Sequence, residues 1–453
     1  MPFIYVVSLV GAIGGMLFGF DTGAISGAIL YLKKEFSLTS GLQEVVTSIA
    51  LLGAAIGATI GGPLADRYGR RHLIVVTAGM FVIGSLAAAA ANSVAWLIAA
   101  RLFIGSAIGV ASFVTPLYLS EIAPAKIRGA LVSLNQVAVT VGILASYLTD
   151  YAFAHDGGWR WMFGVGVVPA LALGIGIMLM PSSPRWLMLV GRRQEAESAL
   201  ARIRGSAAGV DAELQEINTN VSQPKSGYRI LLQPQFRLPL IIGIALAALQ
   251  QVTGINTVIY YAPTIFEFAG LGSAEAAIFA TLGVGIVNVA LTLVALWLID
   301  RVGRRPLLLV GEAGMMVSLV VLGAGFLWHG AGGMTGWITA ASLMAYVGFF
   351  AIGLGPVFWL LIAEIYPQEV RGLAMSVATL TNWAMNLIVA LTFLTLVDAI
   401  GTSATFWTYA VLTAVALVFT WALVPETKGH TLEEIEAHWH AGGHPRALKG
   451  KAT

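Results

Sequence analysis

Long apolar segments dominate this chain and leave few ways for it to fold. Of its 453 residues, 58% are hydrophobic and only 11% are charged. Backbone polar groups in hydrocarbon need internal partners, so an apolar run of about 20 residues predicts a membrane-spanning helix. We expect an all-α membrane protein with twelve transmembrane helices. The predicted spans are residues 4–31, 45–65, 73–92, 95–118, 130–151, 160–180, 238–267, 275–299, 306–328, 337–363, 373–397 and 404–424.

Two short charged motifs each occur twice, about half a chain apart. The first, Asp-Arg-x-Gly-Arg-Arg, occupies residues 66–71 and 300–305. The second, Glu-Ile-x-Pro followed by Arg-Gly, begins at Glu121 and again at Glu364. In each half the first motif follows the second span and the second motif follows the fourth span. All copies therefore lie on one membrane face, which predicts a parallel repeat of two similar halves related by an axis along the membrane normal, as found among secondary transporters.

Polar stretches mark the expected domain boundaries. Residues 182–237 read as a cytoplasmic linker with short surface helices, one of them over residues 195–204. Thr431 to Glu434 has the pattern of a capping box that opens a short helix. We expect an N-terminal bundle over residues 1–181, the linker over 182–237, a C-terminal bundle over 238–424 and a cytoplasmic tail over 425–453.

The distribution of basic residues predicts the topology. Of the 25 Lys and Arg residues, 21 lie in loops on the side of the repeated motifs, while Lys33, Lys34 and Arg160 lie on the other side and Arg101 lies inside a span. By the positive-inside rule the motif side and both termini are cytoplasmic. The first apolar run has no basic leader and is too long for a signal peptide, so we expect a retained span. This asymmetry accounts for the basic residues, so they give no reason to expect nucleic acid binding.

Ionisable groups inside the predicted spans are few, and they are the first candidates for function. Asp21 in the first span and Arg101 in the fourth lie at similar depth in the outer half, which permits a salt bridge. Arg101 favours the charged carboxylate and burial favours the neutral one, so we favour a proton switch over a permanent structural pair. For Glu312 we favour an ion pair with the nearby arginines. No histidine lies mid-membrane, and we expect no histidine relay.

Neutral amides are more numerous. Gln250, Gln251 and Asn256 lie midway along the seventh span, and Gly254 between them is expected to unwind the helix and turn Asn256 toward the glutamines. Buried amides need partners. A single amide often joins two helices, but this number favours a cavity for a neutral polyol. The other members are Gln136, Asn288, Asn382 and Asn386, with Trp359 after a break at residues 353–356 and Trp383 beside Asn382.

Catalytic and nucleotide-binding patterns find no support. The sequence has no phosphate-binding loop of the Gly-x-x-x-x-Gly-Lys-Ser/Thr type and no His/Asp/Glu cluster with metal-ligand spacing. It also contains no cysteine, which excludes disulfides and thiol metal sites. We therefore expect no enzyme activity, no cofactor and no metal.

Taken together, the motifs resemble those of the sugar porters of the major facilitator superfamily, over the whole chain. The resemblance is carried by the two pairs of repeated loops, by residues 250–256 and by Pro425-Glu426-Thr427-Lys428-Gly429. Within that family the chain is most similar to bacterial glucose/proton symporters. The resemblance implies two six-helix bundles that work by alternating access in a bacterial cytoplasmic membrane.

The resemblance also implies roles for individual residues. It makes Asp21 the proton acceptor with Arg101 as its partner. It assigns sugar contacts to Gln136, Gln250, Gln251, Asn256, Asn288, Trp359 and Asn382. It assigns a cytoplasmic latch between the bundles to Asp66, Arg67, Arg70, Arg71, Glu121, Arg128, Asp300, Arg301, Arg304, Arg305, Glu364 and Arg371.

Two positions depart from the family pattern. Ser182 stands where the family's Pro-Glu-Ser-Pro-Arg motif has glutamate, which removes one latch carboxylate and is expected to weaken the outward-facing state. Ile143 stands where the xylose porter has a second glutamine, which favours glucose over xylose.

These patterns predict a monomeric symporter of protons and a monosaccharide, D-glucose or a similar hexose. Three alternatives stay open at this point. The first is a passive uniporter in which Asp21 and Arg101 are a structural pair, and the second is a polyol or pentose transporter of the same fold. The third, a sugar sensor, is disfavoured by the short tail after Pro425.

Overall fold

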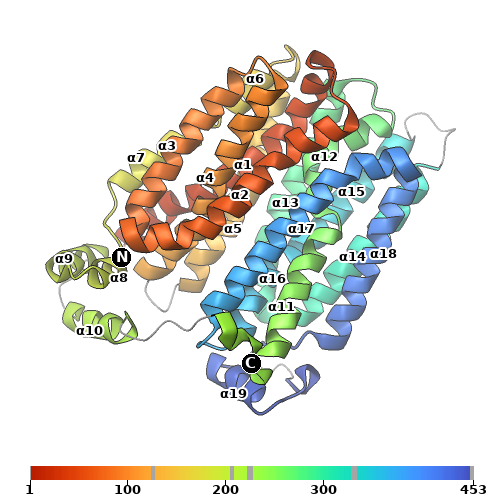
Figure 1. Cartoon of the computed structure of the whole chain (residues 1–453). Helices are drawn as coiled ribbons and strands as arrows, with labels where there is room; N and C mark the ends of the chain where they lie inside the picture. The colour runs from red at the N-terminus through yellow and green to blue at the C-terminus, as the bar shows by residue number, and fades with distance from the viewer. Residues whose placement is uncertain (1, 124–127, 205–208, 222–227, 328–333, 449–453) are drawn as a thin grey trace. The chain divides into compact units, whose positions relative to one another are not determined.

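The structure is a computed structural model that describes residues 2–123, 128–204, 209–221, 228–327 and 334–448 (Figure 1). Within these ranges, 12 helical segments are long and apolar enough to cross a membrane, which confirms the predicted spans. Three of them, the sixth, seventh and tenth, are each built from two consecutive helices. The sequence predicts the breaks in the seventh and tenth spans but not the one in the sixth.

The chain divides into two compact units. The first comprises Met1–Phe36 and Ser48–Lys225, and the second comprises Ser37–Thr47 and Ser226–Thr453. The first unit contains α1 (Pro2–Glu35), most of α2 (Ser40–Tyr68), α3 (Arg70–Ala89), α4 (Val94–Ile122), α5 (Arg128–Ala154), α6 (Trp159–Gly164), α7 (Val167–Met178), α8 (Pro184–Leu189), α9 (Arg193–Arg204) and α10 (Val210–Val221).

Glycines set the packing of α1 against α5. A Cβ atom at Gly19 would overlap the Val139 carbonyl oxygen, and one at Gly23 would overlap the Ser146 hydroxyl. One at Gly27 would lie 2.6 Å from the carboxyl of Asp150. These three glycines, four residues apart, therefore place one face of α1 directly on α5, the close approach that small residues allow in membrane helices.

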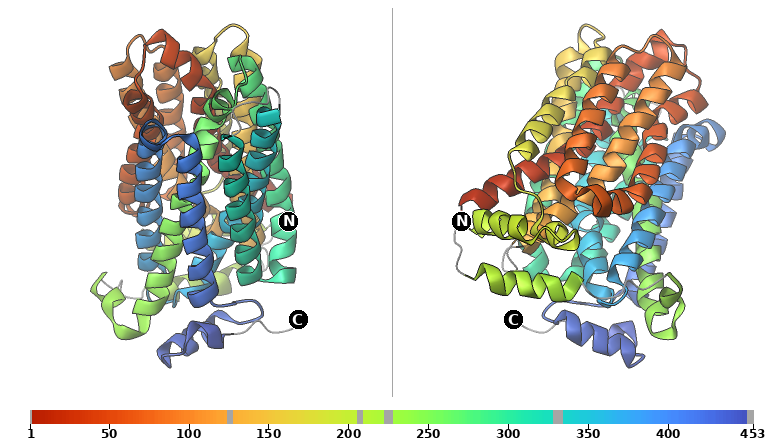
Figure 2. Two further views of the ribbon diagram at one scale, coloured as in Figure 1. Left: turned by 90° about the vertical axis from the view of Figure 1, so that its right-hand side faces the viewer. Right: turned by 60° about the vertical axis from the view of Figure 1, so that its left-hand side comes forward.

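Three short helices form a small core of their own after the sixth span. The predicted helix over residues 195–204 is confirmed as α9, and α8 and α10 lie beside it (Figure 2). Trp186, Leu200 and Leu214 are buried together at their centre. The Trp186 indole N–H also donates to the Asp66 carbonyl at 3.0 Å, so this core is attached to the first repeated motif.

The second unit repeats this architecture. It contains η2 (Tyr228–Leu232), α11 (Pro234–Val252), α12 (Ile255–Phe268), α13 (Ala274–Val302), α14 (Arg304–Gly325), α15 (Met334–Ile352), α16 (Leu354–Ile365), α17 (Arg371–Ile400), α18 (Thr402–Leu423), α19 (Leu432–His440) and η3 (Pro445–Ala447). In both units the first span packs against the fifth, and the third packs against the fourth and the sixth. The parallel repeat read from the motifs is thus present in the packing.

The predicted capping box in the tail is also confirmed. The backbone N–H of Glu434 donates to Thr431 Oγ1 at 3.2 Å, and the Glu434 side chain accepts from the Thr431 N–H at 3.3 Å. The helix that follows, α19, places the His440 ring edge-on to Phe236 of α11, with centroids 5.8 Å apart. The cap therefore fixes the start of a helix that packs on the second unit.

We expect Gly19→Ala to destabilise the protein by about 1–3 kcal/mol, because the new methyl group would force α1 away from the α5 backbone. Thermal unfolding of the purified protein in detergent measures this loss. Gly79→Ala on α3 is the matched control, because a Cβ there meets nothing within 4 Å. Equal unfolding temperatures for the two variants would contradict the packing argument.

Candidate functional site

The seventh span is broken where its amides lie. Gly254 separates α11 from α12 with φ +91°, a left-handed conformation that favours glycine. A Cβ there would also lie 2.9 Å from the Tyr409 ring. The break turns Asn256 back toward the preceding helix, where its Nδ2 donates to Gln251 Oε1 at 2.7 Å. The unwinding predicted at Gly254, and its effect on Asn256, are therefore confirmed.

Four amide side chains form one hydrogen-bonded group, which we call the amide cluster: Gln250, Gln251, Asn256 and Asn382. Gln251 Nε2 donates to Asn382 Oδ1 at 3.1 Å and to Gln250 Oε1 at 3.3 Å. Asn382 Nδ2 donates to Gln250 Oε1 at 2.7 Å and to the Ala247 carbonyl at 3.2 Å. The cluster therefore presents both donors and acceptors, which is the complement of a sugar hydroxyl.

The amide cluster is joined to a second helix break. Gly353, with φ −102° and ψ −102°, separates α15 from α16. The next residue, Leu354, accepts a hydrogen bond at its carbonyl from Gln250 Nε2 at 2.8 Å. Trp359 follows on α16 and packs edge-on against Phe358, with ring centroids 4.8 Å apart. The break predicted before Trp359 thus positions one amide of the cluster.

The other predicted sugar contacts lie outside the amide cluster. Asn288 is buried on α13, and among the described residues it makes no hydrogen bond to the cluster. Gln136 is half-buried on α5 and belongs to the first unit. The structure therefore brings together four of the seven predicted contacts and places Trp359 on the helix that follows the second break.

Asp21 and Arg101 form the predicted ion pair inside the first unit. Arg101 Nη1 lies 3.4 Å from Asp21 Oδ1. Arg101 is 1% exposed and Asp21 is 6% exposed. The guanidinium also stands 5.5 Å from the centroid of the Phe163 ring. A carboxylate buried this deeply is stabilised by its arginine and destabilised by the loss of water. Uptake of a proton by Asp21 would remove the charge that holds α1 to α4.

A second buried acid in the first unit was missed by the sequence analysis. Asp150 on α5 is 1% exposed, and its Oδ2 accepts from the Gly27 backbone N–H at 3.1 Å. Its Oδ1 is buried and has no hydrogen-bond partner among the described residues. The sequence could have indicated it, because Asp150 is an ionisable residue at the end of the predicted span 130–151, just as Asp21 is one inside the predicted span 4–31.

A third buried acid lies at the start of α2. Glu44 is in the segment Ser37–Thr47, which belongs to the second unit, and it is 3% exposed. Its Oε1 accepts from the Thr395 backbone N–H at 2.8 Å, and its Oε2 accepts from the Thr395 hydroxyl at 2.7 Å. No sequence pattern singled it out, because it precedes the predicted span by one residue.

The expectation for Glu312 is wrong. An ion pair with the nearby arginines was favoured, but Glu312 is fully buried and accepts a hydrogen bond from the Thr420 hydroxyl at 2.9 Å. Among the described residues, no basic side chain pairs with it. The reason is that Arg304 and Arg305 find other partners, in the carboxylates and carbonyls of the loops described next.

The first copy of the repeated motifs is centred on Arg70. Its Nη2 lies 3.2 Å from Asp66 and 3.0 Å from Glu121, so one guanidinium joins both motifs. Its Nη1 donates to the Ala65 carbonyl at 3.0 Å. The Ser183 hydroxyl donates to the other oxygen of Glu121. Because Arg70 and Glu121 are buried, this network is stronger than a surface ion pair.

The second copy reproduces the first residue by residue. Arg304 Nη1 lies 3.1 Å from Asp300, and its Nη2 lies 2.8 Å from Glu364. The Thr427 hydroxyl donates to Glu364 in the position that Ser183 takes in the first copy. The Tyr366 phenol, just beyond the tenth span, is also buried, and burial raises its pKa above the ordinary value.

The remaining charged residues of the motifs contact backbone and aromatic rings. Arg67 stands over Tyr68 and Arg301 over Trp297. Arg71 donates to the carbonyls of Ile177 and Met178, Arg305 to that of Trp421, and Arg371 to that of Tyr366. Arg128 begins α5, but its side chain lies outside the described residues. Within each unit the loops thus bind neighbouring helices, while a latch between the units stays a prediction.

The two copies differ at one helix N-terminus. Glu426 Oε1 accepts from the Arg304 backbone N–H and Oε2 from the Arg305 backbone N–H, both at 3.1 Å, so a carboxylate caps α14. In the first half Ser182 occupies the corresponding position, and a serine has no carboxylate to offer the backbone N–H groups of Arg70 and Arg71 at the start of α3. The first half has Ser182 where the family motif has a glutamate. The second half has Glu426 at the corresponding position, where it caps a helix.

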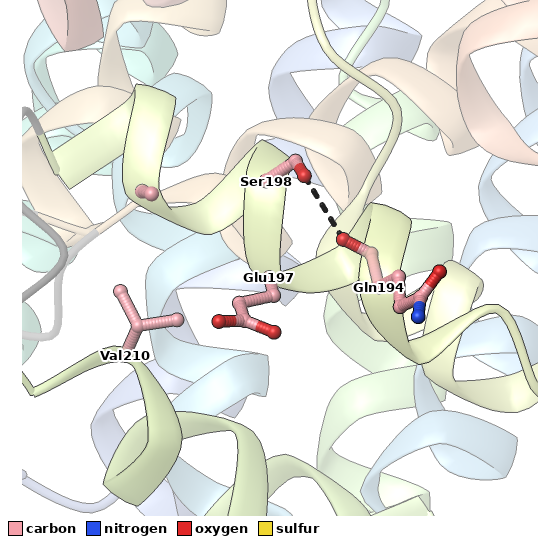
Figure 3. Close-up of a pocket in the computed structure, with 5 residues that line it drawn as sticks. Gln194, Glu197, Ser198 and Val210 are labelled. Carbon is pink, nitrogen blue, oxygen red and sulfur yellow. Dashed lines mark hydrogen bonds between the residues drawn. The ribbon is translucent and has the colours of Figure 1, made fainter.

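A pocket lies away from these groups, between α9 and α10. It is lined by Gln194, Glu197, Ser198, Ala201 and Val210, and the Ser198 hydroxyl donates to the Gln194 carbonyl at 3.0 Å (Figure 3). None of the predicted site residues lines it. The amide cluster and the Asp21–Arg101 pair therefore remain the candidate sites for transport.

A twelve-span chain with a duplicated, charged loop motif and buried amides is a membrane transporter. Residues 7–439 match the family described as Sugar (and other) transporter, and the chain belongs to that family. Its established relatives are transporters, which confirms that the chain is not an enzyme.

Three similar proteins illustrate the relationship. The chain is 42% identical to the glucose transporter GlcP of Staphylococcus epidermidis, over 95% of this chain and 96% of the relative. It is 41% identical to the galactose-proton symporter of Escherichia coli K12, over 97% of this chain and 95% of the relative. A partially occluded, inward-open structure of the xylose transporter XylE from E. coli has a TM-score of 0.83 and 32% identity, over 95% of this chain and all of that one.

We expect Ser182→Glu to stabilise the first unit by about 0.5–2 kcal/mol, because its carboxylate would cap α3 as Glu426 caps α14. Thermal unfolding in detergent measures the gain. Ser182→Gln is the control, since it has the same length without the charge, and Glu426→Ser should lower stability by a similar amount. An equal gain from Ser182→Gln would show that the negative charge of the cap is not responsible, because the glutamine carbonyl can accept only one of the two hydrogen bonds without a charge.

Proposed function

We propose that this protein is a proton-coupled symporter of a monosaccharide, D-glucose or a similar hexose, that works by alternating access. The observation that carries the proposal is the buried Asp21–Arg101 pair, an ionisable site with opposing influences inside an apolar helix pair. The named relatives support it, since they include a glucose transporter and galactose- and arabinose-proton symporters.

The amide cluster supports a sugar as the substrate. Its members hydrogen-bond to one another in this structure, so a ligand must offer equivalent donors and acceptors in return. Hydroxyl groups do so, whereas an ion offers only one kind. A site of paired amides also rejects a ligand that lacks one hydroxyl, because a buried amide is then left without a partner. We assign the sugar contacts to the amide cluster together with Gln136, Asn288 and Trp359.

The proton is assigned to Asp21. Protonation neutralises the carboxyl and weakens its interaction with Arg101, which frees α1 and α4 to rearrange. At a membrane potential of about 100 mV, one translocated charge supplies roughly 2.3 kcal/mol, equivalent to about fifty-fold accumulation of the sugar. A protein that moves a proton with each sugar therefore concentrates sugar, and a passive uniporter only equilibrates it.

The identity of the sugar is proposed from one position on α5 and from the named relatives. Ile143 is 4% exposed on α5, at the position where the family resemblance places a glutamine in the xylose porter. An apolar residue there favours glucose. Related proteins are named for glucose, galactose, arabinose and xylose. We therefore propose a hexose and keep pentoses and polyols as alternatives for the same site.

We further propose that the charged loops and both termini face the cytoplasm. The positive-inside distribution supports this orientation, since 21 of 25 basic residues lie on that side. There the repeated Arg–Asp–Glu networks would act as the latch of the transport cycle. The protein is proposed to function as a monomer in a bacterial cytoplasmic membrane.

Uptake of radiolabelled D-glucose into proteoliposomes, with and without an acid-outside gradient, tests the function. Symport predicts uptake that overshoots equilibrium only with the gradient and collapses with a protonophore. Uptake that merely equilibrates would establish a uniporter. If glucose is not taken up, a panel of pentoses, other hexoses and polyols identifies the substrate.

We expect Asp21→Asn to abolish gradient-driven accumulation while exchange of labelled for unlabelled sugar continues. Asparagine keeps a hydrogen-bond acceptor for Arg101 but cannot carry the proton. Both assays use the same proteoliposomes, so retained exchange is the control for folding. If the variant accumulates as much sugar as the wild type, Asp21 does not carry the proton and its role is structural.

We expect Gln251→Ala to weaken sugar binding by about tenfold or more, because it removes the amide that contacts all three other members of the cluster. Binding to the purified protein is measured by titration calorimetry. Gln235→Ala, near the start of the same helix, is the control and should bind normally. Normal binding by Gln251→Ala would place the sugar elsewhere.

A further inference from the structure

The fully buried carboxyl of Glu312 has no place in the proposed proton pathway through Asp21. Glu312 lies on α14 and is 0% exposed. Its Oε1 accepts a hydrogen bond from the Thr420 hydroxyl of α18 at 2.9 Å, while its Oε2 is buried with no hydrogen-bond partner among the described residues. One oxygen is thus held by a neutral donor, and the other is left in an apolar interface.

Within the part of the chain that the structure describes, no positive charge is paired with this carboxyl. Helix α14 packs against α13, α15, α16 and α18. Neither α15 nor α18 contains a charged residue, and their tyrosines are Tyr346, whose hydroxyl donates to the Thr253 carbonyl, and Tyr409, which lies against Gly254.

The charged groups of the other elements are occupied elsewhere. On α16, Glu364 binds Arg304, which is also paired with Asp300 of α13. Arg301 stands over a tryptophan ring of its own helix, and Arg305 donates to the Trp421 carbonyl. Glu275 is exposed at the start of α13. An ionised Glu312 in this environment would cost several kcal/mol, so the packing seen here fits the protonated, neutral carboxyl.

Glu312 is also connected to the amide cluster through backbone contacts. At the preceding residue, Gly311, a Cβ would lie 2.9 Å from Gly353 Cα and 2.8 Å from the Phe349 carbonyl oxygen, so the two helix backbones touch. Gly353 is the break between α15 and α16, and the next carbonyl, that of Leu354, accepts from Gln250 Nε2 at 2.8 Å. Two contacts within one unit, Gly311 with Gly353 and Leu354 with Gln250, therefore join the helix of the carboxyl to the predicted sugar site.

We propose that Glu312 is a second proton-binding group, and that its proton is linked to sugar binding at the amide cluster. Ionisation would require water or a cation to reach Glu312, which the close packing of α14 on α18 and α15 does not allow. The interface would have to open, which displaces Gly311 from Gly353 and with it the carbonyl that orients Gln250. The protonated form therefore binds sugar more tightly, and by reciprocity sugar binding raises the occupancy of the proton. This inference rests on the proposed function.

The test measures the affinity of the purified protein for D-glucose as a function of pH, in the Asp21→Asn background, where Asp21 no longer titrates. A transported sugar found in the uptake panel replaces glucose if glucose does not bind. We expect affinity to fall by about fivefold or more as the pH rises through the ionisation of Glu312. In the double variant Asp21→Asn/Glu312→Gln the affinity should not change with pH, because glutamine has the shape of the protonated acid and can accept the Thr420 hydrogen bond.

Two further variants keep the test decisive. Asp21→Asn/Glu275→Gln is the matched control, and it should retain the fall in affinity because Glu275 is exposed. Asp21→Asn/Thr420→Val removes the hydroxyl that stabilises the carboxylate, so the fall should move to higher pH even if the glutamine variant does not fold.

The outcomes separate this inference from the proposed function. Sugar binding that is already independent of pH in Asp21→Asn would overturn the inference and leave the symporter proposal standing. So would a pH dependence that survives in the Glu312→Gln double variant. If no sugar binds to the wild type at any pH, the proposed function fails, and the role of Glu312 fails with it.

Discussion

A charge buried in an apolar environment needs a partner, and this requirement decides where the ionisable groups of the protein lie. Arg70 and Arg304 each bind two carboxylates at once, in two loops that share the Asp-Arg-x-Gly-Arg-Arg motif. Arg101 forms an ion pair with Asp21 and also lies over the Phe163 ring. Networks with several partners stay charged in place, whereas a single pair loses its attraction when one proton arrives. The same interaction thus holds the loops at the helix ends and forms one buried ion pair inside the first unit, the pair that we propose to switch with the proton.

The amide cluster obeys the same requirement with neutral groups. Gln250, Gln251, Asn256 and Asn382 donate to and accept from one another. The proposed sugar would have to replace these hydrogen bonds with its own, and the gain in free energy would be the difference between two similar sets. Such a site binds with modest affinity and high selectivity for the number and position of hydroxyls, which suits a transporter that has to release its substrate.

The sequence was sufficient where a feature depends on residues close together along the chain. The spans follow from apolar runs, the break at Gly254 from a glycine between amides, and the cap at Thr431 from a four-residue pattern. Asp21 and Arg101 were paired by depth alone, which worked because each span contains only one candidate. The roles given to these residues remain proposals.

Sequence reasoning failed where the outcome depends on which helices touch. The N–H partner of Asp150 lies 123 residues away, on a helix face that only the glycines of α1 reveal. Glu312 was assigned to arginines because they are near in sequence, but those arginines bind the loop carboxylates, and Thr420 from the last span approaches instead. The missing glutamate at Ser182 was visible in the sequence, but its function as a helix cap was not, because that function depends on where the Glu426 carboxylate lies relative to α14.

That difference between the two loops has a consequence for their motion. The first backbone amides of α14 donate to both oxygens of the Glu426 carboxylate, while Ser182, in the corresponding position of the first half, has no carboxylate to offer those of α3. Amides without such a cap open to solvent more readily, so we expect faster hydrogen exchange at the start of α3 than at the start of α14. Two loops with the same charged residues therefore fluctuate differently, and the symmetry of the sequence does not extend to the dynamics of the molecule.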